Sequence, residues 1–242
     1  MGRFARVAGS SIGKKLVMAV TGAAMLAWVI AHLTGNLKVF FGRSDVNDYS
    51  QWLHDHPSLL WTTRAGILAF FLYHLVNGVR LSLANRRARP ARYHHDVALR
   101  STLASRHMLL SGAVVLSFIV FHLLHLTFQV THPQYQMLIE SQKGLNRPDV
   151  FAMLLTAFQD PLLAGSYVLS VGLLGLHLYH GAASLFQTLG LSHPSYSVPI
   201  RSGAKALAVL LTLGFWSIPI AIFIHFNVTP LPFVDWSSVH KW

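Results

Sequence analysis

Two histidines, His177 and His180, lie three residues apart within the apolar run from Gly175 to Gly190. Residues three or four positions apart share one face of a helix. An imidazole surrounded by hydrocarbon is energetically costly, so its presence there indicates a functional site. The chain has no cysteine, which excludes disulfides, cysteine-ligated iron–sulfur clusters and thiol catalysis. Histidine is therefore the metal ligand to consider. Haem iron, which accepts axial imidazole ligands, is the first chemistry that this pattern indicates.

The composition is that of an integral membrane protein. Of the 242 residues, 53% are hydrophobic and 11% are charged, whereas soluble domains carry roughly 25% charged residues. One crossing of a membrane needs about 20 apolar residues. Five segments meet this need and none contains an acid: residues 16–37, 61–84, 108–130, 162–187 and 205–226. We predict one all-α membrane domain, residues 1–242, with five transmembrane helices; residues 131–161 are expected to form a long polar loop with a helical turn or two.

The basic residues gather on one side of this predicted topology. Residues 1–15 and the loops 85–107 and 188–204, with their flanks, carry thirteen basic residues and one acid, a net charge of +12. The other side carries six basic and seven acidic residues, a net charge of −1, and the two sides add to the +11 of the whole chain. Because cytoplasmic loops are enriched in Lys and Arg, the N-terminus is predicted to be cytoplasmic and the C-terminus outside. Topology thus explains the charge, so membrane lipid is an expected partner and nucleic acid is not.

Six of the 15 histidines fall inside the first four spans, and their depths suggest pairs. With a rise of about 1.5 Å per residue, His32 and His122 both lie on the outer side of the bilayer middle, His32 by roughly 8 Å. By the same rise His180 lies about 9 Å to the cytoplasmic side of the middle. His74 lies slightly past the middle on that side, so helix tilt must make up the difference in depth between the two histidines. Four of the helices can therefore form a bundle that binds two haems, each between two imidazoles. Such ligation leaves iron no open position and favours electron transfer over oxygen binding.

Two ligand positions stay open, because His125 and His177 each lie one turn from a nominated ligand. Cationic residues at the span ends are candidate partners for haem propionates, although they also serve as interfacial anchors. They are Lys14, Arg80, Arg106 and Lys205 on the cytoplasmic side, with Lys38 and Arg64 on the outer side. Glycines within the spans either admit a flat macrocycle or serve helix packing. They are Gly35, Gly78, Gly172, Gly175 and Gly181.

Several motifs cover most of the chain from Ser10 to about Ser192. They are SSIGKKLVMAVTG and AHLTGNL in the first span, LYHLVNGVRL and NRRARPARY in and after the second, VFHLLHL in the third, and HLYHGAASLFQTLGL in the fourth. Together they resemble the cytochrome b558 subunit of succinate dehydrogenase and fumarate reductase, a five-helix, two-haem membrane anchor of bacteria. In this family the fourth-helix ligand is the histidine followed by glycine, and the third-helix ligand is the first histidine of HLLH. The resemblance therefore implies an outer haem on His32 and His122 and a cytoplasmic-side haem on His74 and His180.

The resemblance also implies a function for the chain. It would be the membrane-anchor cytochrome b subunit of succinate:quinone oxidoreductase, in the bacterial cytoplasmic membrane. A flavoprotein subunit would carry out the succinate and fumarate chemistry, and an iron–sulfur subunit docked on the cytoplasmic face would exchange electrons, through two b haems, with quinone, usually menaquinone. Two alternatives stay open: the di-haem anchor of another quinone-linked dehydrogenase, and a haem or metal transporter that uses the histidines as relay sites.

Overall fold

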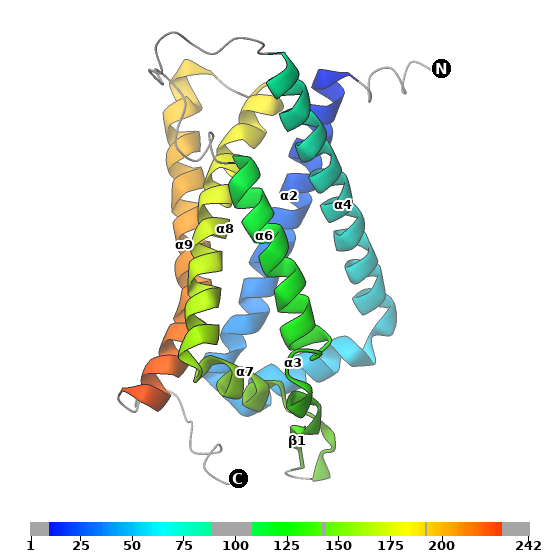
Figure 1. The fold of residues 1–242 in the computed structure, drawn as a ribbon, viewed down its shortest axis with the longest axis vertical. Helices are drawn as coiled ribbons and strands as arrows, with labels where there is room; N and C mark the ends of the chain where they lie inside the picture. The colour runs from blue at the N-terminus through cyan, green and yellow to red at the C-terminus, as the bar shows by residue number, and fades with distance from the viewer. Residues whose placement is uncertain (1–9, 89–107, 142–143, 192, 229–242) are drawn as a thin grey trace. The chain divides into compact units, whose positions relative to one another are not determined.

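The structure is a computed structural model that describes residues 10–88, 108–141, 144–191 and 193–228. The helices and short strands follow one another along the chain as shown in Figure 1. They are α2 (Ser11–Asn36), η1 (Leu37–Phe41), α3 (Arg43–Asp55), α4 (Pro57–Arg87), α6 (Met108–His122), η2 (Leu123–Thr127), η3 (Pro133–Met137), β1 (Ile139–Glu140), β2 (Arg147–Pro148), α7 (Val150–Phe158), α8 (Pro161–Thr188) and α9 (Pro194–Asn227). Five stretches, Ser11–Phe41, Pro57–Arg87, Met108–Thr127, Pro161–Thr188 and Pro194–Asn227, are long and apolar enough to cross a membrane. The predicted helical, multi-pass character and the number of spans are thereby supported.

The chain divides into two compact units. Unit 1 comprises residues 1–29, 63–113 and 175–209, and unit 2 comprises residues 30–62, 114–174 and 210–242. Each of the five long helices contributes one segment to each unit. The histidines of the predicted sites are divided in the same way: His74, His177 and His180 belong to unit 1, and His32, His122 and His125 belong to unit 2.

Local capping explains where the later helices begin. The Asp160 side chain accepts hydrogen bonds from the N–H groups of Leu162 and Leu163, at 2.7 and 3.0 Å, and Pro161 occupies the first turn of α8. This is a favourable helix start, because a proline there gives up an N–H that has no partner within the helix. Helix α9 likewise begins at a proline, Pro194, well before the predicted start of the span at residue 205. The difference arises because hydropathy locates the apolar part of a helix, whereas the polar turns before it follow from capping.

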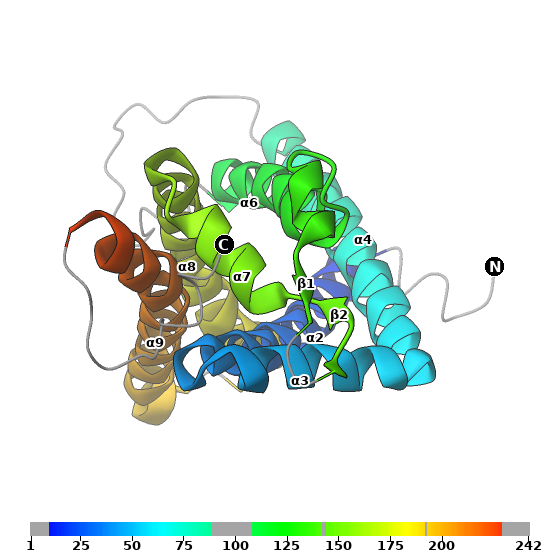
Figure 2. The same ribbon diagram turned by 90° about the horizontal axis from the view of Figure 1, so that it is seen from below.

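The connection between the third and fourth spans is more ordered than a polar loop. It contains the 3-10 turn η3, the antiparallel pair β1 and β2, and the nine-residue helix α7, of which seven residues are buried. Helix α7 packs against α3 within unit 2 (Figure 2). The sequence VFAMLLTAF is far too short to span a bilayer. Its apolar side chains therefore form a core with neighbouring elements.

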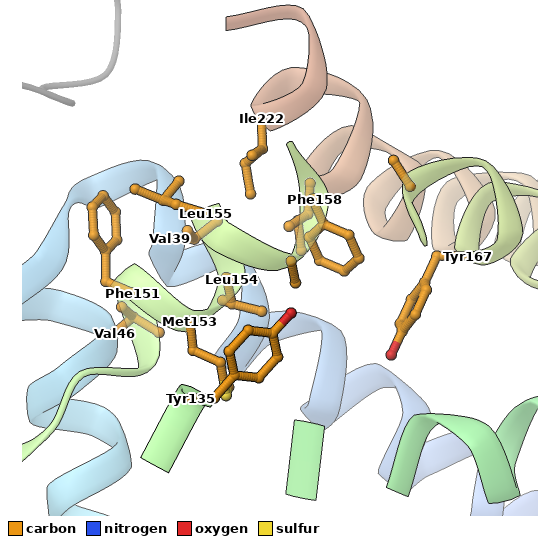
Figure 3. Packing of buried hydrophobic residues seen from close by; sticks show 13 residues of the cluster. Val39, Val46, Tyr135, Phe151, Met153, Leu154, Leu155, Phe158, Tyr167 and Ile222 are labelled. Carbon is orange, nitrogen blue, oxygen red and sulfur yellow. The ribbon is translucent and has the colours of Figure 1, made fainter. Parts of the chain in front are cut away.

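This core is the main buried cluster of unit 2, and Figure 3 shows its side chains. Phe151 and Leu155 of α7 are almost fully buried and pack with Val39, Ile222 and Tyr135. By contrast, the long helices expose many large apolar side chains, such as those of Leu162, Leu169 and Leu210. Exposed apolar surface of this kind is unusual in soluble proteins and suits a lipid environment.

A buried polar network holds α3, β1, β2 and α7 together. Asn47 of α3 donates to Glu140 at 3.0 Å and to Asp149 at 2.9 Å, and its side-chain oxygen accepts from the N–H of Phe151 at 3.0 Å. Arg147 pairs with Glu140 at 2.7 Å and, through another nitrogen, with Asp48 at 2.7 Å. Burial alone lowers the pKa of the Arg147 guanidinium, but hydrogen bonds and charges from the two carboxylates outweigh it and raise this pKa above its ordinary value. The network stays charged and links segments about a hundred residues apart.

Candidate functional site

Unit 2 brings together two histidines from different helices. His32, near the end of α2, and His122, at the end of α6, have ring centroids 6.0 Å apart and ring planes at 87°. Phe215 of α9 lies against His32 with a centroid separation of 5.9 Å, and Phe118 lies against His122 at 5.8 Å. The structure thus places side by side the pair that depth along the helices predicts, in a largely apolar setting.

Unit 1 contains a second pair. His74 of α4 and His177 of α8 have ring centroids 6.3 Å apart and ring planes at 64°. His180, the predicted partner of His74, lies one helical turn further along α8, and among the described residues it makes no ring contact with His74. The contacts therefore favour His177 opposite His74, while the ligand role of His180 stays a prediction.

The separations of both pairs fit one metal ion held between two imidazoles. Metal–imidazole bonds are about 2 Å long, and with about 1.1 Å from nitrogen to ring centre, two rings on opposite sides of one ion have centroids about 6 Å apart. The observed separations of 6.0 and 6.3 Å agree with this arrangement. Within the described ranges no group of three or more His, Cys, Asp or Glu residues could hold a metal ion. A site built by protein side chains alone is thus not found there, whereas haem supplies four of its own nitrogen ligands to iron.

Hydroxyl groups on other helices contact the imidazoles of the unit 1 pair. Thr21 Oγ1 lies 3.3 Å from His74 Nδ1, and it also contacts two carbonyls of its own helix at 2.7 and 3.3 Å. Ser111 Oγ lies 3.3 Å from His177 Nδ1 and 3.1 Å from the carbonyl of Met108. When each hydroxyl donates its proton to a carbonyl of its own helix, it accepts from Nδ1, and Nε2 then keeps the lone pair that a metal ion requires. An outer hydrogen bond of this kind is typical of ligating histidines.

The choice between His122 and His125, open from the sequence, is narrowed by hydrogen bonds. Both ring nitrogens of the fully buried His125 contact tyrosine hydroxyls, Nδ1 with Tyr167 at 2.9 Å and Nε2 with Tyr135 at 3.3 Å. His122 uses Nδ1 in a 3.4 Å contact with the Tyr167 hydroxyl and faces His32 with its ring. The geometry therefore favours His122 over His125 as a metal ligand, and the ligand role of His122 stays a prediction.

Two glycines that the sequence analysis did not nominate lie beside the unit 1 pair. A Cβ on Gly22 would lie 3.4 Å from His74 Cε1, and a Cβ on Gly112 would lie 3.6 Å from His177 Cε1. Among the nominated glycines, a Cβ on Gly172 would lie 3.1 Å from Cζ2 of Trp216, which is helix packing. Whether a glycine adjoins a histidine depends on which helices are neighbours, and no local pattern in the sequence carries that information.

The candidate propionate partners differ in their surroundings. Lys14 of unit 1 and Lys38 of unit 2 are half-buried, and the Lys38 ammonium lies 5.6 Å from the centroid of the Tyr49 ring. Arg80 and Lys205 are exposed residues of unit 1. The half-buried Arg64, predicted for the outer side, falls just inside unit 1, and Arg106 lies outside the described residues. Their role with propionates stays a prediction.

The hydroxyl residues that contact the histidines were not predicted as their partners from the sequence. Thr21, Ser111 and Tyr167 each lie within an apolar span, where a hydroxyl often bonds to its own helix. A hydroxyl residue in a predicted span, at a depth similar to that of a histidine, is a weak signal for such a contact.

No protein-family model, curated protein or solved structure matches this chain.

Proposed function

We propose that the chain is a di-haem cytochrome b, the membrane anchor and quinone-reacting subunit of a succinate:quinone oxidoreductase. The observation that carries the proposal is the presence of two histidine pairs on different helices, with ring centroids 6.0 and 6.3 Å apart, one in each unit. The motif resemblance supplies the choice of enzyme. When bound, two b haems would supply one-electron transfer between an iron–sulfur subunit and quinone.

The chain's own residues perform three tasks in this proposal. His32 and His122 hold the outer haem iron, and His74 holds the cytoplasmic-side iron from α4. The Thr21 hydroxyl, by accepting from His74 Nδ1, would leave Nε2 of that ring for the iron. Iron held by two imidazoles would offer oxygen no free position, which favours electron transfer over oxygen binding.

The partner of His74 is either of two histidines on α8. The ring contact and the hydrogen bond to Ser111 favour His177, whereas the motif resemblance favours His180. Alanine substitution at each position separates them. Substitution of the true ligand should abolish the same haem signal that His74→Ala abolishes. Substitution of the other histidine should leave that signal in place.

The remaining parts of the proposal concern the setting of the protein. We propose the bacterial cytoplasmic membrane with a cytoplasmic N-terminus, because the basic residues gather on the side of residues 1–15. The same basic side would receive the iron–sulfur subunit, which in turn carries the flavoprotein. Menaquinone is the proposed quinone on the strength of the resemblance.

The test is haem quantitation on the purified full-length chain. The pyridine haemochrome assay should give about two haems b per polypeptide, one for each bis-histidine pair. His32→Ala and His122→Ala should each remove one spectral component and leave the other, and His74→Ala should do the reverse. A haem content near zero, or loss of both components in every variant of a stably folded protein, contradicts the proposal. Metal transport with readily exchanged ligands would favour the transporter alternative.

A further inference from the structure

The polar side chains behind His122 form a continuous series that the proposed function does not use. Tyr167 of α8 contacts both His122 and His125, and His125 in turn contacts Tyr135 of η3. All four residues belong to unit 2, and His125, Tyr135 and Tyr167 are each at most 6% exposed. Buried polar groups of this kind cost stability unless they are paired, so the series is expected to be fully satisfied.

The number of protons fixes the direction of the series. If His122 presents Nε2 to iron, its neutral ring carries a proton on Nδ1, which is donated to the Tyr167 oxygen. The single Tyr167 proton is then donated to His125 Nδ1, and His125 donates from Nε2 to the Tyr135 oxygen. The three contacts along the series measure 3.4 Å from His122 to Tyr167, 2.9 Å from Tyr167 to His125 and 3.3 Å from His125 to Tyr135.

From this chain of hydrogen bonds we infer that Tyr167 is a positioning residue for the His122 ligand. Its hydroxyl accepts the Nδ1 proton of His122, and His125, by accepting the Tyr167 proton, keeps the hydroxyl turned for that purpose. The inference rests on the proposed haem function and deepens it. Tyr167 would thereby influence the redox potential of one of the two haems, the one that His122 would hold.

The expected effect follows from the electron density of the ligand. A hydrogen bond accepted from Nδ1–H raises the basicity of the ligating imidazole, which stabilises ferric over ferrous iron. Loss of an outer hydrogen-bond partner typically lowers metal affinity about 10-fold or more, and because the hydrogen bond favours ferric iron we expect a tenfold loss of ferric relative to ferrous affinity. For a one-electron couple, a tenfold change corresponds to about 59 mV, towards easier reduction.

The structure supplies a variant that removes the hydroxyl and little else. Tyr167 also packs its ring against Phe118, Phe121 and Phe158, with centroids 5.2, 6.1 and 4.9 Å away. Tyr167→Phe keeps these contacts. Tyr196→Phe is the matched control, because Tyr196 is an exposed residue of α9 that stacks on His193.

The experiment is a redox titration of the full-length chain in detergent, with the two haems resolved by their absorption bands and by low-temperature EPR. Tyr167→Phe should raise the midpoint potential of the haem that His122→Ala removes by about 59 mV and alter its EPR signal, while the other haem is unchanged. Tyr196→Phe should change neither. Unaltered potentials in a Tyr167→Phe protein with both haems overturn the inference.

A second pair of variants keeps the inference testable if Tyr167→Phe does not assemble. His125→Leu removes the acceptor of the Tyr167 proton and should shift the same haem in the same direction. His125→Gln, which can accept from Tyr167 and donate to Tyr135, should restore a potential close to that of the wild type. Equal potentials in His125→Leu and the wild type contradict the inference. A wild-type chain without haem, or a His122→Ala protein that keeps both haems, would instead refute the proposed function.

Discussion

Replacement of Asn47 by alanine should locally destabilise helix α7. The Asn47 side chain is 1% exposed and makes three hydrogen bonds, two to carboxylates and one to the N–H of Phe151. Hydrogen bonds to charged groups contribute about 1.5–3 kcal/mol each, and removing the acceptor of a buried N–H costs about 1–3 kcal/mol. These contributions are not additive, because neighbouring groups relax together. We therefore expect a loss of about 3 kcal/mol, less than the sum of the three contributions.

Hydrogen exchange read out by mass spectrometry measures this loss where it occurs. Peptides that cover Val150–Phe158 should lose protection in Asn47→Ala, because the hydrogen bonds that anchor the first turn of α7 are gone. Gln51→Ala is the control on the same helix, since the side chain of Gln51 bonds to Asp55 at an exposed position. It should change the opening free energy by no more than about 0.5 kcal/mol.

An isosteric variant makes the reasoning about Asn47 sharper. Asn47→Asp keeps the oxygen that accepts from Phe151 but places a third carboxylate beside Glu140 and Asp149. It should lose at least as much protection at neutral pH as Asn47→Ala, because like charges without donors are costly when buried. If α7 keeps the wild-type protection in both variants, the network does not hold the helix in place and the argument fails.

Two further predictions follow from the site and its surroundings. Gly112→Val should displace the His177 ring, because a Cβ there would lie 3.6 Å from Cε1 and valine adds two methyl groups. We expect a loss of about 1–3 kcal/mol in the free energy of unfolding, measured by thermal unfolding, and weaker haem binding in unit 1. The control Gly66→Val, at a position with open space around it, should cause neither change. Burial, aided by the charge of Asp160, raises the pKa of Tyr135 to about 12 from 10.0. The neutral phenol is therefore favoured in the folded protein, and stability that is complete below pH 10 should be lost as the pH rises towards about 12. Tyr135→Phe should remove this part of the alkaline transition, and an identical pH profile in the variant would contradict the assignment.

The membrane spans were predictable because hydropathy is a local property of the chain. Residues 16–37 and 162–187, for example, fall within α2 with η1 and within α8. Helix α7 was not predicted because a largely apolar run of nine residues is too short to give a membrane signal. Its burial depends on contacts with α3, which is remote in sequence. The extension of α9 to Pro194 escaped for a related reason, since its first turns are polar.

The candidate site was predictable in part. Depth along the helices suffices to match His32 with His122, whose rings the structure places 6.0 Å apart. It does not suffice for α8, because His177 and His180 differ by a single turn, and which of them faces His74 depends on helix rotation. Tyr167 could not be predicted, since its hydroxyl gains meaning only from the two histidines of another helix that lie next to it.

The π-helical turn η2 follows His122 and contains His125. In this turn the N–H of Phe128 bonds to the carbonyl of Leu123, five residues earlier, at 2.8 Å, so one more residue is accommodated than in an α-helical turn. In a regular α-helix the two histidines would share one face. In the structure the His125 ring contacts Tyr135, whereas the His122 ring lies beside His32, and the Tyr167 hydroxyl contacts both histidines. The wider turn is thus the place where a single hydroxyl joins two histidines of one segment, and deletion of a residue from Leu123–Thr127 should break that connection.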